Sequence, residues 1–399
     1  MKKLHPQIAV INAGSSSIKF AVYDMRRSLV KKLAGSIVGI GSKDPEFIAW
    51  NKAENNVSTE KIKATDFDSG TRWLIEWMQA QQWFEQVIVF GHRIVHGMRH
   101  AQAEIITDDL LKELNKIKDY DPDHLPAELQ IIHLLRERCP SVLQVACFDT
   151  AFHTTIPEVA KKFAIPKSYY DENIQRYGFH GISYTYLMQA LKKQDKKEAR
   201  GKIILAHLGN GASLAAVKNG KCIDTSMGFT PAGGIVMSTR SGDLDPGIAW
   251  YLMQKGMDAK AFNNLINHKS GLFGISGISS DMQDLLKHKK DNQDARLAID
   301  IFCYHIKKFI GGYAATLAGL DVLVFSGGIG EHSPIIRSRI CKGLQYLGIE
   351  LNEKKNKKNE WLISRGSSAV KVYVIPTDEE LMIAQNAESL FAGTKNNHK

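Results

Sequence analysis

Several features that would assign a chain to a special class are missing from this sequence of 399 residues. The five cysteines are scattered and form no CxxC pair, which favours reduced thiols over a disulfide framework or a zinc site. No apolar run approaches the roughly 18 residues that a membrane span needs. After Met1-Lys2-Lys3, polar residues interrupt any apolar segment of a signal peptide. We therefore expect a cytoplasmic protein with no membrane partner.

Basic residues are in excess, and the formal net charge is +10. Much of this excess lies in lysine-rich runs without interleaved Phe, Tyr or Trp, at 192–197, 287–290 and 354–358. Solvated surface is the ordinary explanation for such runs, so we expect no nucleic-acid partner. An excess of positive charge still raises the local concentration of anionic substrates.

Two similar strand–turn–strand segments lie about 195 residues apart, one at 7–24 and the other at 202–217. Aligning Gly14 with Gly209 brings Phe20-Ala21-Val22 over Ala215-Ala216-Val217. The similarity indicates either a duplicated architecture or two hairpins that are alike by chance. Elsewhere strands alternate with helical patterns, so we expect an α/β fold.

Three glycine-rich turns follow apolar strands, at 12–17, 209–211 and 327–330. Glycine allows backbone N–H groups to approach a phosphate closely. The GxxxxGK[ST] loop is absent, and Gly328-Ile329-Gly330 does not continue as a dinucleotide-binding GxGxxG turn before a helix. A nucleotide cradle and a set of ordinary tight turns therefore remain equal alternatives.

Cationic residues gather in further glycine-containing motifs, at 91–97, 176–181 and 238–243. Arg93 and Arg240 belong to these motifs, and arginine suits planar, bidentate contact with phosphate or carboxylate. Each arginine could instead form an ordinary surface ion pair, and each histidine could be a core residue whose ring nitrogens are hydrogen-bonded.

Candidate acids follow predicted strands. Asp149 follows the strand predicted at 142–146, and Glu379 and Glu380 lie in the turn after another. Such carboxylates suit Mg²⁺, although Glu379 could equally stabilise a helix N-terminus. Phosphate-binding turns, cations and acids in one chain favour phosphoryl transfer to an anionic acceptor.

Taken together, these motifs resemble the acetate kinase family, within the larger superfamily of acetate and sugar kinases, Hsp70 and actin. The matching segments keep the family order and are 10–19, 91–97, 148–153, 176–181, 207–211, 239–246, 327–331 and 376–381. The resemblance implies two duplicated actin/Hsp70-like (ribonuclease H-like) α/β domains with a nucleotide cleft between them. It implies an N-terminal domain at 1–150, against which the C-terminal helix at about 381–399 packs. It also implies a C-terminal nucleotide-binding domain at 151–380.

The activity implied by the resemblance is reversible, in-line transfer of the ATP γ-phosphoryl group to acetate, giving acetyl phosphate and ADP. The alternative within the family is a short-chain acyl kinase that prefers propionate. A sensor or assembly ATPase is the alternative from a different class. Mg²⁺, with Mn²⁺ as a substitute, is the implied metal, and a homodimer is the implied assembly.

The resemblance also assigns roles to individual residues. Asn12 and Glu379 would hold the metal, with Glu380 as the alternative carboxylate. The catalytic residues would be Arg93, Asp149, His180 and Arg240, with Asp149 as acid/base or metal-positioning group. The acid-binding residues would be Arg93, Val95, His124, Phe179 and Pro231. The nucleotide and its phosphates would contact Ser15, Ser17, Lys19, His207, Leu208, Gly209, Asn210, Gly211, Asp281, Met282, Gln283, Gly328, Ile329, Gly330, Glu331 and His332.

Four residues, in three segments, depart from the family pattern. Asp123 stands where the family usually has leucine, Gln283 replaces a common arginine, and 231–234 reads Pro-Ala-Gly-Gly instead of Pro-Leu-Glu-Gly. These changes bear on acyl-chain and nucleotide preference, whereas the residues assigned to phosphoryl transfer are retained.

Overall fold

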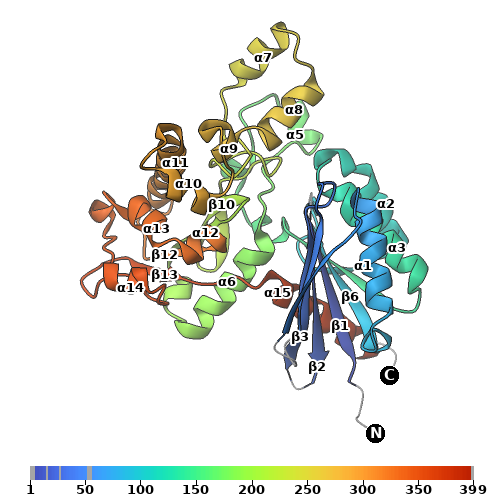
Figure 1. The fold of residues 1–399 in the computed structure, drawn as a ribbon. Helices are drawn as coiled ribbons and strands as arrows, with labels where there is room; N and C mark the ends of the chain where they lie inside the picture. Colours follow the sequence, from blue (N-terminus) through green and yellow to red (C-terminus); the bar gives the residue numbers. More distant parts are fainter. Residues whose placement is uncertain (1–4, 15–16, 27, 52–55, 397–399) are drawn as a thin grey trace. The chain divides into compact units, whose positions relative to one another are not determined.

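The computed structural model of the chain describes residues 5–14, 17–26, 28–51 and 56–396. Its contacts divide the chain into two compact units, one of Met1–Ala151 with Asp378–Lys399 and the other of Phe152–Thr377. Each unit is built on its own β-sheet with helices packed on it (Figure 1). No helix among the described residues has the length and apolar character to cross a bilayer.

Unit 1 contains an eight-stranded sheet in the order β5-β4-β3-β2-β1-β6-β8-β7. Its strands are β1 (Gln7–Ala13), β2 (Ser17–Met25), β3 (Leu29–Val38), β4 (Glu46–Asn51), β5 (Asn56–Lys61), β6 (Val87–Ile94), β7 (Glu104–Ile105) and β8 (Leu143–Phe148). β1 and β3 pair antiparallel with β2, whereas β1, β6 and β8 run parallel. The carboxyl ends of three parallel strands therefore meet at one edge of the sheet.

Unit 2 contains a five-stranded sheet in the order β11-β10-β9-β12-β13. Its strands are β9 (Lys202–Leu208), β10 (Ala212–Lys218), β11 (Lys221–Thr225), β12 (Val322–Ser326) and β13 (Lys371–Val374). β9 and β11 pair antiparallel with β10, and β9, β12 and β13 run parallel.

The two sheets share one topology, because three antiparallel strands are followed by two parallel ones in the same spatial order. The strand limits also correspond: β1 and β2 begin at Gln7 and Ser17, while β9 and β10 begin at Lys202 and Ala212. Chance similarity of two hairpins does not produce this correspondence across five strands. The duplicated α/β architecture is confirmed.

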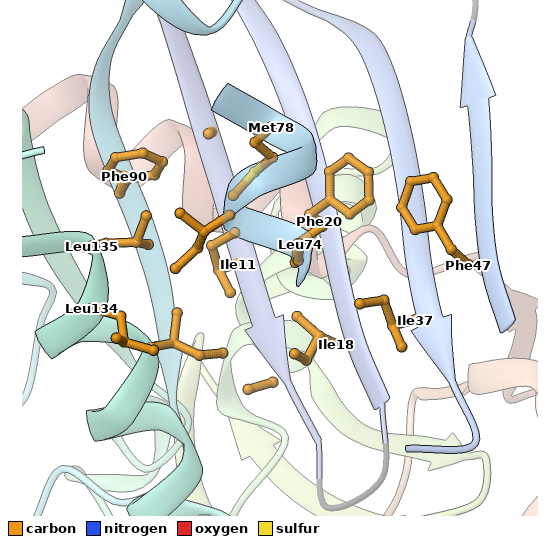
Figure 2. Packing of buried hydrophobic residues seen from close by; sticks show 14 of the residues in the cluster. Ile11, Ile18, Phe20, Ile37, Phe47, Leu74, Met78, Phe90, Leu134 and Leu135 are labelled. Atoms are coloured by element: carbon orange, nitrogen blue, oxygen red, sulfur yellow. The ribbon is translucent and has the colours of Figure 1, made fainter. Parts of the chain in front are cut away.

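Two helices of unit 1 bury an apolar stripe against one face of its sheet. α1 (Phe67–Gln79) begins at the capping box of Asp66 and Ser69, which satisfies orphan N–H groups at its first turn. Its buried residues Leu74 and Met78 pack with Phe20 and Phe90 of the sheet, and α3 (Leu125–Arg138) joins the same core (Figure 2). Burial of this apolar surface is the main force that holds the layers together.

The opposite face of the unit 1 sheet is covered by α15 (Glu379–Asn396), which contacts β1, β6 and β8 (Figure 1). A side chain at Gly91 would place its Cβ 2.7 Å from Cγ2 of Ile383, so glycine allows this close approach. The remaining helices of this unit are η1 (Phe84–Gln86), α2 (Asp108–Lys116) and η2 (Lys118–Tyr120), and η3 (Ala151–His153) lies at the unit boundary.

In unit 2, α6 (Gly181–Gln194) packs on one sheet face, where Leu187 and Leu191 meet Ile203 and Val324. α11 (Gln293–Thr316) contacts β9 and β10. The other helices are α4 (Glu158–Lys161), α5 (Lys167–Asp171), η4 (Glu198–Arg200), α7 (Pro246–Gln254), α8 (Ala259–His268), α9 (Gly271–Ser276), α10 (Met282–His288), α12 (Gly327–His332), α13 (Pro334–Cys341), η5 (Gln345–Leu347) and α14 (Glu353–Lys357).

One expectation about local structure is wrong. The segment Gly327–Gly330 was expected as a glycine-rich turn without a helix, but these residues form the first turn of α12. The reason is local: Glu331, four residues further along the same helix, accepts the Gly327 N–H through its carboxylate and so satisfies the helix N-terminus.

Candidate active site

Arg93 and Asp149 form a buried ion pair at the carboxyl edge of the unit 1 sheet. Arg93 lies near the end of β6, and Asp149 directly follows the parallel strand β8. The Arg93 Nε and Nη2 groups donate to Oδ2 of Asp149 at 3.0 and 2.6 Å, and Nη1 donates to the Ala13 carbonyl at 3.3 Å. The side chains of Arg93 and Asp149 are 14% and 1% exposed, so the arginine is held rigidly.

Asn12 and Glu379 meet at the same edge. Asn12 lies on β1 and donates from Nδ2 to Oε2 of Glu379, the first residue of α15, at 3.2 Å. Burial raises the pKa of Glu379 to about 7, and the charge of Asp149 acts in the same direction. Arg93 and Lys19 oppose this rise.

The donor chemistry of this pair fits the magnesium ion that the resemblance implies. Mg²⁺ usually takes one or two carboxylates from protein and completes its shell with phosphate oxygens and water. Glu379 supplies a carboxylate and Asn12 an amide oxygen. The described residues contain no group of three or more His, Cys, Asp or Glu side chains that could hold a metal by themselves. Such a site would therefore depend on phosphate and water ligands.

A third carboxyl group, that of Glu128, adjoins Arg93 and was not expected from the sequence. Its Oε2 accepts the Val95 N–H at 2.9 Å, and its Oε1 lies 3.9 Å from Nη1 of Arg93. Burial raises the pKa of Glu128 to about 8 even though Arg93 acts to lower it. The available signal was helical spacing: Glu128 is three residues after Leu125 and four before Ile132, both of which face the core.

The predicted acid-binding residues belong to both units. In unit 1, Val95 is buried, and Nδ1 of His124 lies 2.8 Å from Oδ1 of the buried Asp121. In unit 2, Phe179 and Pro231 are buried.

A second cluster of predicted residues forms at the β9–β10 turn of unit 2. His180 has a positive φ of 60° at the start of α6, and its ring stacks on His207 at 4.3 Å between centroids. Nδ1 of His180 lies 2.9 Å from Oγ of Ser213. A Cβ at Gly211 would lie 3.1 Å from Nε2 of His180 and 3.6 Å from Nη1 of Arg240. The fold therefore brings His180, His207 and Arg240 together around the glycine turn.

The third glycine segment lies beside this turn. Gly327 has a positive φ of 73°, and a Cβ there would lie 2.7 Å from the carbonyl oxygen of Leu208. Only glycine allows the backbones of β9 and the β12–α12 junction to approach so closely. A Cβ at Gly209 would similarly lie 4.0 Å from the backbone nitrogen of Gly328. Glu331 Oε1 accepts the N–H groups of Gly327 and Thr377 at 2.9 and 3.1 Å.

The other predicted nucleotide residues occupy several places. Asp281 is the N-cap of α10 and accepts the Asp284 N–H at 2.8 Å, with Met282 and Gln283 in the first turn. Asn210 accepts the Ser238 N–H through its carbonyl, and Ile329, Gly330 and His332 belong to α12.

In unit 1, Ser17 begins β2, and Lys19 on the same strand lines a pocket of about 240 Å³ together with Glu380. Glu379 instead contacts Asn12. The two carboxylates that could hold the metal therefore have different neighbours, with Glu380 in the pocket of Lys19 and Glu379 beside Asn12. Ser15 lies outside the described residues.

The fold and these two clusters define a duplicated α/β protein with glycine turns, cations and acids at the carboxyl edges of both sheets. A sequence model described as the acetokinase family matches residues 7–385. The chain belongs to the acetokinase family, so the resemblance seen in its motifs is confirmed.

Individual relatives agree with this assignment. The acetate kinase of Clostridium acetobutylicum is 42% identical over 97% of this chain and 99% of that protein. The acetate kinase of Coprothermobacter proteolyticus is 40% identical over 97% of this chain and 99% of that protein. Among solved structures, Porphyromonas gingivalis acetate kinase is 34% identical with a TM-score of 0.86, covering 97% of this chain and 100% of that one. A propionate kinase from Francisella tularensis is 35% identical with a TM-score of 0.90, covering 96% and 99%. These likenesses confirm the predicted fold class.

Proposed function

We propose that this chain is an acetate kinase, which transfers the γ-phosphoryl group of ATP reversibly to acetate to give acetyl phosphate and ADP. The observation that carries the proposal is the buried Arg93–Asp149 pair beside Asn12 and Glu379, in a chain of the acetokinase family. The pair offers an anion-binding arginine next to groups suited to magnesium.

Arg93 would bind the carboxylate of the acceptor acid. The described residues use three of its five N–H donors, two on Asp149 and one on Ala13, which leaves two for a planar anion. Carboxylic acids titrate near pH 4, so acetate is already ionised at neutral pH and needs no strong base. Val95, His124, Phe179 and Pro231 would form the acid-binding surface.

The main barrier to the reaction is the approach of two anions. Glu379 and Asn12 would hold Mg²⁺, or Mn²⁺ in its place, which when bound neutralises phosphate charge. His180 and Arg240 would stabilise charge on the transferring group, and Asp149 would keep Arg93 in position. The γ-phosphoryl group would pass directly and in line from ATP to acetate, without a covalent enzyme intermediate.

The glycine segments of unit 2 would bind the nucleotide through backbone N–H groups at Gly209–Gly211 and Gly328–His332. His207, Leu208 and the start of α10 would line the same site. Ser17 and Lys19 would face the phosphates from unit 1, together with Ser15. We propose that unit 1 is an N-terminal domain that includes the C-terminal helix, and that unit 2 is the nucleotide-binding domain.

We also propose a homodimer and a cytoplasmic location, each supported by one observation. Several apolar side chains of α7 are exposed, with Trp250 at 68% and Tyr251 at 56%, which supports a homodimer formed through unit 2. All five cysteines are free thiols, which supports a cytoplasmic location.

An acyl-phosphate assay tests the proposed function. The purified protein is incubated with ATP, Mg²⁺ and either acetate or propionate, and the product is trapped with hydroxylamine. We expect acetyl hydroxamate, formed at a higher kcat/KM than propionyl hydroxamate. A preference for propionate would make propionate the proposed substrate and leave the proposed mechanism unchanged. The likeness to a propionate kinase supports testing this outcome. No acyl phosphate from either acid would refute the proposal.

A further inference from the structure

Among the residues that the structure describes, Glu128 is the carboxyl group beside Arg93 to which the proposed reaction gives no role. It lies in the first turn of α3 with its side chain only 1% exposed. Its Oε2 accepts the Val95 N–H, whereas Oε1 is buried and accepts no hydrogen bond within the described part of the chain. A buried carboxyl oxygen left unpaired is costly unless the group has a further task or holds a proton.

We propose that Glu128 is a positioning residue that holds the acid-binding segment at Val95 and sets the charge that Arg93 presents to the acceptor acid. The inference rests on the proposed function, because it concerns the same acid-binding site. It adds a residue that none of the sequence motifs includes.

The positioning part follows from the contacts. Arg93 and Val95 are two residues apart in the chain, and Glu128 contacts both. It accepts the Val95 N–H, and its Oε1 lies 3.9 Å from Nη1 of Arg93. Because α3 is anchored in the core by Leu125 and Ile132, Glu128 ties this segment to a rigid element. Such support from a fixed neighbour keeps a binding group in its productive geometry.

The charge part follows from counting the groups around Arg93. The charges of Asp149 and Glu379 already act on the guanidinium, so an ionised Glu128 would make the surroundings of Arg93 more negative and weaken its attraction for a carboxylate. The groups that face Glu128 from neighbouring elements are Arg93 on β6, Asp149 after β8 and Asp121 before α3. Burial raises the pKa of Glu128 to about 8, so the group is neutral at pH 7 and the site remains able to bind an anion.

The test compares Glu128→Gln with Glu128→Ala. Glutamine keeps an oxygen for the Val95 N–H and cannot ionise, whereas alanine removes both the hydrogen bond and the charge. Glu137→Gln is the matched control, because Glu137 lies exposed on the same helix. Steady-state KM for acetate and for ATP, and kcat, are measured for all variants across pH.

We expect the acetate KM of the wild-type protein to rise roughly tenfold between about pH 7 and about pH 9, as ionisation near the pKa of about 8 predicts. Glu128→Gln should abolish this rise and leave the acetate KM at pH 7 close to the wild-type value. Glu128→Ala should raise the acetate KM by about tenfold at pH 7, with the ATP KM unchanged. Glu137→Gln should keep the wild-type profile.

Wild-type pH dependence in Glu128→Gln would overturn the charge-setting role, and equal changes in the KM values for both substrates in Glu128→Ala would overturn the positioning role. If Glu128→Ala does not fold, Glu128→Gln alone decides the proposal. Absence of acyl phosphate with the wild-type protein would refute the proposed function and this inference together. An active wild-type enzyme with unaltered variants would refute the inference alone.

Discussion

Replacing Gly327 by alanine is expected to destabilise unit 2 through a collision that can be read directly from the backbone. Gly327 has a φ of +73°, where L-residues are strained. A Cβ at this position would lie 2.7, 2.8 and 2.9 Å from three backbone atoms of Leu208. Because these atoms belong to β9, a flexible side chain cannot move aside to relieve the contact.

The expected magnitude has two parts. A left-handed conformation costs an L-residue about 1 kcal/mol. Forcing a packed backbone apart adds about 1–3 kcal/mol, as for other overpacked sites. The sum is roughly 2–4 kcal/mol, which corresponds to a fall in Tm of roughly 4–16 °C for a unit the size of Phe152–Thr377.

Thermal unfolding by calorimetry provides the measurement, and the neighbouring glycine provides the control. A Cβ at Gly328 meets no atom within 4 Å, so Gly328→Ala should stay within about 0.5 kcal/mol of the wild type. Equal stability of Gly327→Ala and Gly328→Ala would refute the reasoning. A loss in both variants would also refute it, because the two positions differ in the contacts of the added methyl group.

Three further outcomes are expected. Arg93→Ala should raise the acetate KM by about tenfold or more, because the proposed acid-binding cation is gone. It should also lower kcat by about tenfold or more, because Asp149 loses its two hydrogen bonds. A change in kcat alone, measured by steady-state kinetics, would contradict the assignment. Glu331→Ala should lower the free energy of unfolding by about 1–3 kcal/mol, because two backbone N–H groups lose their acceptor, and urea denaturation measures this loss. Glu128 keeps its proton up to a pKa of about 8 when folded but releases it near the ordinary value of 4.5 when unfolded. The wild-type protein should therefore lose stability relative to Glu128→Gln as pH rises through this window, and parallel stability curves for the two proteins would disprove this.

Much of the fold could be predicted from local sequence patterns. The apolar runs and glycine turns at 7–24 and 202–217 predict the first two strands of each sheet. Their similarity left duplication and chance as alternatives, and the matching order of five strands in both sheets decides for duplication. Strands β1, β9 and β10 are buried along almost their whole length, so continuous apolar runs bounded by turn residues mark them, and both signals come from residues that are close together in the chain. The motifs also predicted the acetokinase family, which the match over residues 7–385 confirms.

The residues of the candidate site could be proposed from the sequence, and their roles remain predictions. Asp149 follows a predicted strand and Arg93 belongs to a cationic glycine-containing motif, which marks both as candidate site residues. Their contact is a property of the parallel pairing of β6 with β8, across 56 residues of chain. Asn12 and Glu379 meet across 367 residues, because α15 returns to the unit 1 sheet.

Only the tertiary structure decided the environment of these side chains. Helical spacing puts Glu128 on the core-facing side of its helix, but only the contacts with Val95 and Arg93 show that it is buried beside a cation, where burial raises its pKa. Gly327 likewise looks like one glycine of a loop, whereas the adjoining backbone of Leu208 leaves no room for a Cβ there without strain. Local propensity and motif order are properties of the chain itself, so the sequence determined the strands, the turns and the family. Burial and close approach depend on segments that are distant in the chain, so only the folded structure determined which charges meet.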